Sequence, residues 1–254
     1  MCLVALAWNA HPRWRLVIAG NRDESHARPT APLARWPDRG VLAGRDLRSG
    51  GTWIGLGPAG RAAVVTNVRD GLPRPFDGPS RGALPLDFLA GNAAAQAHAE
   101  ALAADAGRYA PFNLLLADAD GCAYVGNHPA SGAHAIAAGV HALSNGDFDA
   151  PWPKVRHLRA AMTAWAEADD DGLAPLWQAL ADERIAPDAE LPDTGVGIDL
   201  ERRLSPAFIR GDAYGTRAST IIAIDHDGRG FIHERRFGPG GHFDGETVLS
   251  SNAL

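Results

Sequence analysis

Short, almost continuous apolar runs alternate along the chain with turns rich in glycine, proline, asparagine and aspartate, and this pattern predicts β-strands. The longest runs show no polar alternation, so we expect those strands to be covered on both faces. We expect about ten strands, at residues 3–8, 14–20, 40–43, 52–56, 61–66, 113–118, 121–127, 134–142, 217–225 and 230–237.

Four segments have the composition and length of helices, at residues 84–90, 93–106, 153–168 and 173–184. Segments 25–38, 71–82 and 185–200 carry prolines and glycines and are expected to be largely irregular. The strands come in antiparallel-looking pairs with helices in blocks between them. This order predicts an α+β fold of layered sheets, with the helices on the outer faces, rather than a wound βαβ fold. Without a repeat or a low-complexity linker, we expect one domain over residues 1–254.

The first two strands are predicted to pair as an antiparallel hairpin around a turn that contains Pro12. We place Trp8 opposite Trp14, which sets Cys2 opposite Gly20. The polar segment Asn21-Arg22-Asp23 then emerges beside Cys2 at the same end of the sheet.

Composition excludes several classes of function. Basic residues are scattered, and the formal net charge is -6, so we expect no nucleic-acid partner. No apolar run approaches the ~18 residues of a transmembrane helix, and residues 3–8 are too short for a signal peptide. We therefore expect a cytoplasmic protein. The only cysteines, Cys2 and Cys122, make no disulfide framework, and the ten histidines lack metal-ligand spacing, so no metal is expected.

Cys2 becomes chemically interesting if Met1 is removed. The new α-amine has a reference pKa of roughly 7.7–8.0, near that of a thiol at about 8.5, and can take the thiol proton. Arg22 would favour the thiolate, and Asp23 could hold the amine or orient Arg22. Taken alone, Cys2 is simply the second residue of a strand, and Arg22-Asp23 is a local ion pair.

Cleavage of an amide also needs donors for the oxyanion. Asn67 and Asn145 each follow an apolar strand, where a side chain can project into a site. Each also suits an ordinary turn, and Arg217 suits a surface charge at a strand start. The case for a site is the joint placement of these residues.

Ordered motifs along nearly the whole chain resemble one family. The Asn21-Arg22-Asp23-Glu24 segment is the signature of the NRDE family, also called the transport and Golgi organisation protein 2 family. The other matching blocks are Met1-Cys2, Gly44-Arg45-Asp46-Leu47, Gly50-Gly51-Thr52-Trp53-Ile54-Gly55, Thr66-Asn67-Val68-Arg69, Ser80-Arg81-Gly82, Phe112-Asn113-Leu114, Leu143-Ser144-Asn145-Gly146, Pro151-Trp152-Pro153-Lys154-Val155 and Tyr214-Gly215-Thr216-Arg217.

The family is similar to amino-terminal-nucleophile hydrolases of the choloylglycine hydrolase and penicillin V acylase group. This resemblance implies a four-layer αββα sandwich of two antiparallel sheets. Carried over residue by residue, the catalytic set of that group corresponds to Cys2, Arg22, Asp23, Asn67, Asn145 and Arg217. Arg22 and Asp23 are adjacent here but separated in the group, and neighbouring strand residues point to opposite faces. One of the two is therefore expected to leave the site unless a bulge or turn reorients it.

Two functions remain open at this point. The first is a cysteine hydrolase of a small non-peptide amide, with Cys2 as nucleophile and no cofactor. The second is a non-catalytic binding or trafficking protein for haem, acyl-CoA or another lipid, which only the resemblance implies. The chain has no Cys-x-x-Cys-His motif, so any haem would be held non-covalently.

Overall fold

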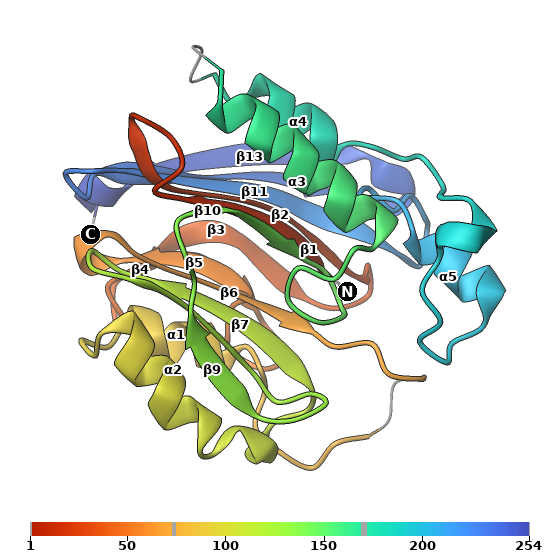
Figure 1. The fold of residues 1–254 in the computed structure, drawn as a ribbon, viewed down its shortest axis with the longest axis horizontal. Helices are drawn as coiled ribbons and strands as arrows, with labels where there is room; N and C mark the ends of the chain where they lie inside the picture. The colour runs from red at the N-terminus through yellow and green to blue at the C-terminus, as the bar shows by residue number, and fades with distance from the viewer. Residues whose placement is uncertain (1, 73–74, 169–171, 254) are drawn as a thin grey trace.

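Two antiparallel β-sheets face each other and carry helices on their outer faces (Figure 1). This is a computed structural model, and it describes residues 2–72, 75–168 and 172–253. The predicted α+β fold, a four-layer αββα sandwich, is confirmed. The two central layers come from different parts of the chain, and residues from both layers meet at one end of the sandwich.

The first sheet has six strands, and the second has seven. In spatial order the first sheet contains β10 (Gly139–Leu143), β1 (Cys2–Trp8), β2 (Trp14–Ser25), β11 (Tyr214–Asp225), β12 (Gly230–Phe237) and β13 (Phe243–Ser250). The second contains β3 (Thr30–Trp36), β4 (Val41–Asp46), β5 (Ile54–Gly57), β6 (Arg61–Asn67), β7 (Phe112–Ala117), β8 (Cys122–Gly126) and β9 (Gly132–Ala135). The first sheet joins the two ends of the chain, because β2 pairs with β11 (Figure 1).

The helices cover the outside of both sheets. Helices α3 (Pro153–Ala166) and α4 (Ala174–Leu180) pack on the first sheet. Helices α1 (Ala83–Leu89) and α2 (Ala95–Ala103) pack on the second. The short helix α5 (Ile198–Leu204) contacts the start of α3, where Lys154 donates to the Leu204 carbonyl. The described part of the chain thus has five α-helices, one more than the sequence predicts.

Strand alternation divides the core into three apolar layers. In β1, Val4 and Leu6 face the second sheet, whereas Leu3 and Ala5 face α3 and α4. Both sets are almost fully buried, as the continuous apolar run predicts. Burial on both faces fixes which side of the sheet each β1 residue occupies, because a slip of one residue would exchange the two sets.

The predicted register of the first hairpin is wrong by two residues. Trp8 pairs with Leu16, and Cys2 pairs with Arg22 rather than with Gly20. The turn is longer than expected, since the Asn9 amide donates to the Arg15 carbonyl at 2.8 Å. Because the slip is an even number, every side chain stays on its predicted face. Strand β2 also continues to Ser25, so the polar signature lies within the strand and not after it.

Other differences concern the edges of the sheets. Segment 25–38, expected as a loop, contains β3, and β13 was not predicted. Both are partly exposed edge strands with little continuous apolar sequence. The expected strand 134–142 is two strands in different sheets, and the chain changes sheet before Gly139 at a φ of 141°. Segment 185–200, expected as irregular, includes the start of α5.

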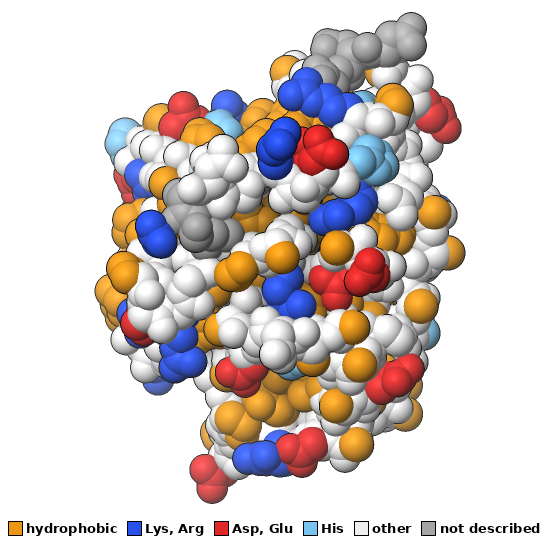
Figure 2. All heavy atoms as spheres, turned by 90° about the vertical axis from the view of Figure 1, so that its left-hand side faces the viewer, with side chains coloured by type: hydrophobic (Ala, Val, Ile, Leu, Met, Phe, Trp, Pro, Cys, Tyr) orange, Lys and Arg blue, Asp and Glu red, His pale blue; other side chains and the backbone are white. Residues whose placement is uncertain are grey.

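Within the described residues, every helix falls short of the length and apolar character that crossing a membrane requires. On the coloured part of the face in Figure 2, lysine and arginine side chains are interspersed with aspartate and glutamate side chains. That part of the surface therefore has no extended basic patch of the kind that binds nucleic-acid phosphates.

A histidine–carboxylate hydrogen bond connects β10 with the loop that follows it, and its contribution to the free energy of unfolding should depend on pH. His141 Nδ1 lies 2.8 Å from Asp149 Oδ2, and this hydrogen bond raises the pKa of His141. A raised folded-state pKa stabilises the fold below the unfolded value of about 6.5, and this stability is lost as pH rises through the folded pKa. His141→Asn should lower the free energy of unfolding by about 0.5–1 kcal/mol near pH 5.5 and by less above neutral pH.

Urea unfolding of both proteins from about pH 5 to pH 9 measures this difference. His134→Asn is the matched control, because His134 packs on Tyr124 and Phe148. It has no carboxylate partner in the described part of the chain. A difference for His141→Asn that is independent of pH would show that the ring acts only by packing.

Candidate active site

The sulfur-bearing residue at the start of β1 lies directly opposite an arginine. Cys2 pairs with Arg22, and both are on the side of the first sheet that faces the second. The Arg22 guanidinium stacks on the Trp53 ring, with 4.3 Å between the guanidinium carbon and the ring centre. It also donates to Thr30 Oγ1 at 3.2 Å and faces the carboxylate of Asp46 at 3.9 Å. These contacts fix a positive charge beside Cys2.

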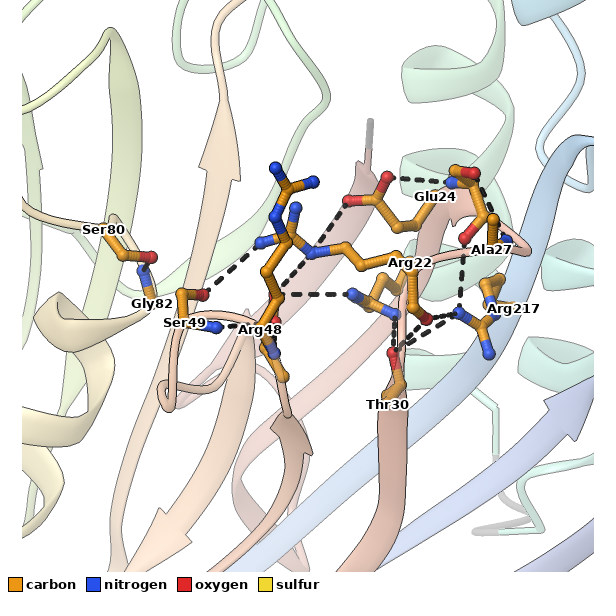
Figure 3. A network of polar contacts seen from close by, with 12 residues as sticks. Arg22, Glu24, Ala27, Thr30, Arg48, Ser49, Ser80, Gly82 and Arg217 are labelled. Atoms are coloured by element: carbon orange, nitrogen blue, oxygen red, sulfur yellow. Dashed lines mark hydrogen bonds and ion pairs between the residues drawn. The ribbon is translucent and has the colours of Figure 1, made fainter. Parts of the chain in front are cut away.

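A β-bulge brings the second predicted arginine to the same place. On β11 the register shifts at Arg217, because Thr216 pairs with Asp23 and Ala218 with Arg22. The extra residue turns the Arg217 side chain toward the second sheet. There it donates to Thr30 Oγ1 at 3.3 Å and to the carbonyl oxygens of Ser25 and Arg28. Figure 3 shows Arg22 and Arg217 converging on Thr30.

The two predicted asparagines are held together across the junction of the sheets. The Asn145 amide group donates to the backbone carbonyl of Asn67 at 2.8 Å and to its Oδ1 at 3.1 Å. Ser144 Oγ donates to the Cys2 carbonyl at 2.7 Å, and Thr66 Oγ1 donates to the Ser144 carbonyl at 2.9 Å. Asn67 Oδ1 accepts from Asn145, and the Asn67 side-chain amide makes one long donation, at 3.5 Å, to the Val68 carbonyl. Asn145 is fully buried, so it positions Asn67 and does not meet solvent.

Asp23 occupies the other face of the sheet, as expected from its place next to Arg22. Its Oδ1 accepts a hydrogen bond from Thr216 Oγ1 at 2.7 Å. Burial raises the pKa of the Asp23 carboxyl, and the charge of Lys154 acts in the opposite direction. Lys154, at the start of α3, is itself buried and donates to the Leu204 carbonyl at 2.8 Å. Burial lowers the pKa of Lys154 to about 8.

Burial dominates the electrostatics of the thiol. It raises the pKa of Cys2, and the negative charge of Asp23 adds to this effect. The Arg22 charge and the Asp23 backbone N–H act the other way but do not reverse the shift. Cys2 is therefore a thiol in this environment, and it needs a base before it can attack a carbonyl.

A cleft of about 960 Å³ opens beside these residues. Asn67 and Glu24 line it, whereas Cys2 itself is not among its lining residues. Its wall is largely apolar, and Leu72, Phe76 and Ile185 on that wall are exposed large side chains. Four arginines also line it: Arg69, Arg81, Arg203 and Arg210. The volume of this cleft and the mixture of apolar and charged residues that line it are typical of a site for a small molecule.

Residues 1–239 match the family described as "Transport and Golgi organisation 2". The chain belongs to this family. Among its relatives, a transport and Golgi organization protein 2 homolog of Bos taurus is 30% identical over 260 residues, which is 92% of each chain. The Homo sapiens homolog is 28% identical with the same coverage of both chains. The Drosophila melanogaster protein is 27% identical over 94% of this chain and 93% of its own.

The fold is also similar to that of solved structures, two of which follow. One is a cysteine-to-alanine mutant of a conjugated bile acid hydrolase from Clostridium perfringens. It is 9% identical, has a TM-score of 0.57, and the match covers 100% of this chain and 93% of that one. Another is a Caenorhabditis elegans ortholog of N-acylethanolamine-hydrolyzing acid amidase, 11% identical, with a TM-score of 0.53 and coverage of 87% and 92%. At such identities, the likeness shows the amino-terminal-nucleophile hydrolase fold alone.

Three residues that support this site were not predicted as site residues from the sequence. Thr30 lay in a segment expected to be a loop, and Ser144 was noted only as part of a motif. Lys154 could have been recognised from the sequence. It follows Pro151 and Pro153 at the start of an apolar helix face, and a lysine at such a position is seldom buried without a partner.

The Trp53 ring under Arg22 depends on a glycine in β4. A Cβ at Gly44 would lie 2.3 and 2.6 Å from two Trp53 ring atoms. We expect Gly44→Ala to displace the ring and to lower the free energy of unfolding by about 1–3 kcal/mol. Urea unfolding tests this against Gly121→Ala, because a Cβ at Gly121 meets nothing within 4 Å. Equal unfolding free energies for the two variants would contradict the proposed crowding.

Proposed function

We propose that this chain, after removal of Met1, hydrolyses the amide bond of a small non-peptide substrate, with Cys2 as the nucleophile. Met1 lies outside the described residues. The observation that carries the proposal is the junction of the two sheets. There Cys2 pairs with Arg22, and Ser144 and Asn145 link the Cys2 backbone to an asparagine that lines the cleft.

The proposed reaction uses one base twice. The α-amine of Cys2 takes the thiol proton as the sulfur attacks the amide carbonyl carbon. The negative charge that develops on the oxygen is stabilised by the side-chain N–H of Asn67. Collapse expels the substrate amine, which takes the proton, and leaves a thioester on Cys2. Water attacks the thioester, the α-amine takes the proton of that water, and the carboxylic acid and the free thiol are released.

The environment of Cys2 favours its own amine as this base. Burial raises the thiol pKa, so Arg22 alone does not supply a thiolate. The Asp23 carboxylate and the Lys154 amine lie on the helix-facing side of the sheet, and each already has a hydrogen-bond partner. In this proposal Asp23 and Lys154 act as positioning residues.

Two measurements test the proposal. Intact-mass analysis should show that Met1 is absent from the purified protein. That protein should then hydrolyse members of a panel of N-acyl amides with acyl chains of different lengths, detected as released amine. A protein that retains Met1, or one that lacks Met1 and cleaves no member of the panel, would contradict the proposed hydrolase.

A second candidate is non-catalytic binding of an acyl-CoA or another lipid, favoured by the exposed apolar residues Leu72, Phe76 and Ile185 on the cleft wall. The cleft suits haem less well. Its described lining contains no histidine, cysteine or methionine, and Tyr214 donates its hydroxyl hydrogen to the Asp23 carbonyl at 3.1 Å. Saturable binding of decanoyl-CoA at micromolar concentration, unchanged by Cys2→Ser and without turnover, would favour this candidate.

A further inference from the structure

Arg81 is held in the cleft by a contact between two loops that only glycine permits. A Cβ on Gly51 would lie 2.3 Å from the backbone of Gly82, and the Thr52 amide donates to the Gly82 carbonyl at 3.0 Å. Figure 3 shows the turn at Ser80 and Gly82 next to Ser49. This backbone contact sets the position of Arg81 between Ser80 and Gly82, so the loop presents the arginine at a defined place.

The guanidinium lies close to the proposed catalytic residues. Arg81 NH1 donates to the Pro111 carbonyl at 2.8 Å, and the same carbonyl accepts from the Val68 amide at 3.1 Å. Val68 follows Asn67, whose amide is held by Asn145. Burial lowers the pKa of Arg81, and a negative charge at Cys2 acts in the opposite direction, so the two groups lie within electrostatic reach. Arg81 therefore lies at the end of the cleft that Asn67 lines.

Arg81 also differs from the other arginines of the cleft in its partners. Arg69 pairs with Glu201 at 2.6 Å, and Arg210 pairs with Glu183. Within the described chain, the only side-chain hydrogen bond of Arg81 runs from NH1 to the Pro111 carbonyl, and no carboxylate lies within ion-pair distance of it. The Glu24 carboxylate, which also lines the cleft, acts on the Arg81 charge from farther away. In any arginine, the Nε and NH2 atoms form the guanidinium edge that can bind a carboxylate with two parallel hydrogen bonds. Arg203 also lacks an ion pair among the described residues, but it is exposed to solvent.

We infer that Arg81 binds a carboxylate on the amine side of the scissile bond, so that the preferred substrates are N-acyl amino acids with an apolar acyl chain. This inference rests on the proposed hydrolase function. The acyl chain would lie along the apolar wall formed by Leu72, Phe76 and Ile185, and the amide would lie between Cys2 and Asn67. In this arrangement the Nε and NH2 atoms of Arg81 would meet the carboxylate of the amino acid that leaves.

Two substrates that differ in one group test the inference. N-Decanoylglycine and N-decanoylethanolamine share the acyl chain and the amide, but only the first has a carboxylate. Arg81→Gln should lower kcat/KM for decanoylglycine by about 10- to 100-fold, because a charge-assisted pair is lost. It should change kcat/KM for decanoylethanolamine by less than about threefold. Arg229→Gln removes an exposed arginine that does not line the cleft, and it should change neither value by more than about threefold.

A binding measurement separates this inference from the hydrolase proposal. Decanoylglycine should slow the alkylation of Cys2 by iodoacetamide, whether or not decanoylglycine is hydrolysed. Peptide mass mapping measures the extent of alkylation. Arg81→Gln should weaken this protection about tenfold, and Arg229→Gln should leave it unchanged. Protection that depends on Arg81, without turnover, would overturn the hydrolase but support carboxylate binding by Arg81.

The same data contain the outcomes that would overturn the role of Arg81. The first is an equal loss of kcat/KM with both substrates. The second is protection of Cys2 that is the same in Arg81→Gln and Arg229→Gln. If Arg81→Gln does not fold, Arg81→Lys replaces it, because lysine keeps the charge but not the two-point geometry. Retention of the full preference for decanoylglycine in Arg81→Lys would also contradict the two-point contact.

Discussion

Replacement of Cys2 by serine should reduce amide turnover by at least about a thousandfold while the protein stays folded. A hydroxyl is a much weaker nucleophile than a thiolate near neutral pH, and the substitution changes the side chain by one atom. The free energy of unfolding should therefore change by no more than about 1 kcal/mol. Steady-state kinetics with the best N-acyl amide of the panel, together with urea unfolding, measures both quantities.

Cys122→Ser is the matched control for this experiment. Cys122 is buried between the sheets, and burial raises its thiol pKa to about 12, so it is chemically inert. A hydroxyl there should lower the free energy of unfolding by about 1–3 kcal/mol. Activity per folded molecule should remain. Equal losses of activity in the two variants would assign the effect of Cys2 to structure and remove it from the reaction.

The second large effect is expected at a residue that touches no substrate. Asn145→Ala removes both donations that hold Asn67, at 2.8 and 3.1 Å. If Asn67 stabilises the oxyanion, its misplacement should lower kcat by about 10²–10³-fold. KM should change much less, because the cleft walls that bind the substrate remain. The kinetic constants of the variant, determined over a full range of substrate concentration, give this split.

Asn127→Ala provides the comparison for an amide whose hydrogen bonds lie outside the site. Its Nδ2 donates to the Ala106 and Tyr109 carbonyls at 2.9 Å, and its Oδ1 accepts from the Phe112 amide at 2.9 Å. Each alanine variant should lose about 1–3 kcal/mol of stability. Only Asn145→Ala should lose most of its kcat. A parallel fall in kcat for the two variants would show that Asn145 supports the fold and not the chemistry.

Apolar periodicity was sufficient to predict the layers of the fold. Strands that are buried on both faces, such as β1, have continuous apolar runs of strand length between turn residues, which is a strong local signal. Edge strands give a weaker signal, because one side is exposed and the chain can accept prolines there. Pro32 in β3 is such a residue, and it made a paired strand resemble a loop. Nothing in the local sequence of residues 132–143 reports that the chain passes from one sheet to the other.

The identity of the residues in the candidate site could be predicted from the sequence, but most of their arrangement in space could not. Strand-end positions and the family motifs identified Cys2, Arg22 and Asn67, and the alternation of β2 placed Asp23 on the opposite face. The bulge that turns Arg217 toward Thr30 depends on long-range pairing with β2, so no local pattern could reveal it. The partnership of Asn67 with Asn145 is likewise a contact between two sheets.

The pairing of β2 with β11 also has a consequence for the order of events during synthesis. Asp23 and Thr216 are separated by 193 residues, so β11 leaves the ribosome long after β2. At about 5–20 residues per second, the delay is roughly 10 to 40 s. During this interval the carboxy-terminal half of the first sheet does not exist, and the edge of β2 is open. In the proposed hydrolase, a methionine aminopeptidase would have this interval in which to remove Met1 before β11 pairs with β2.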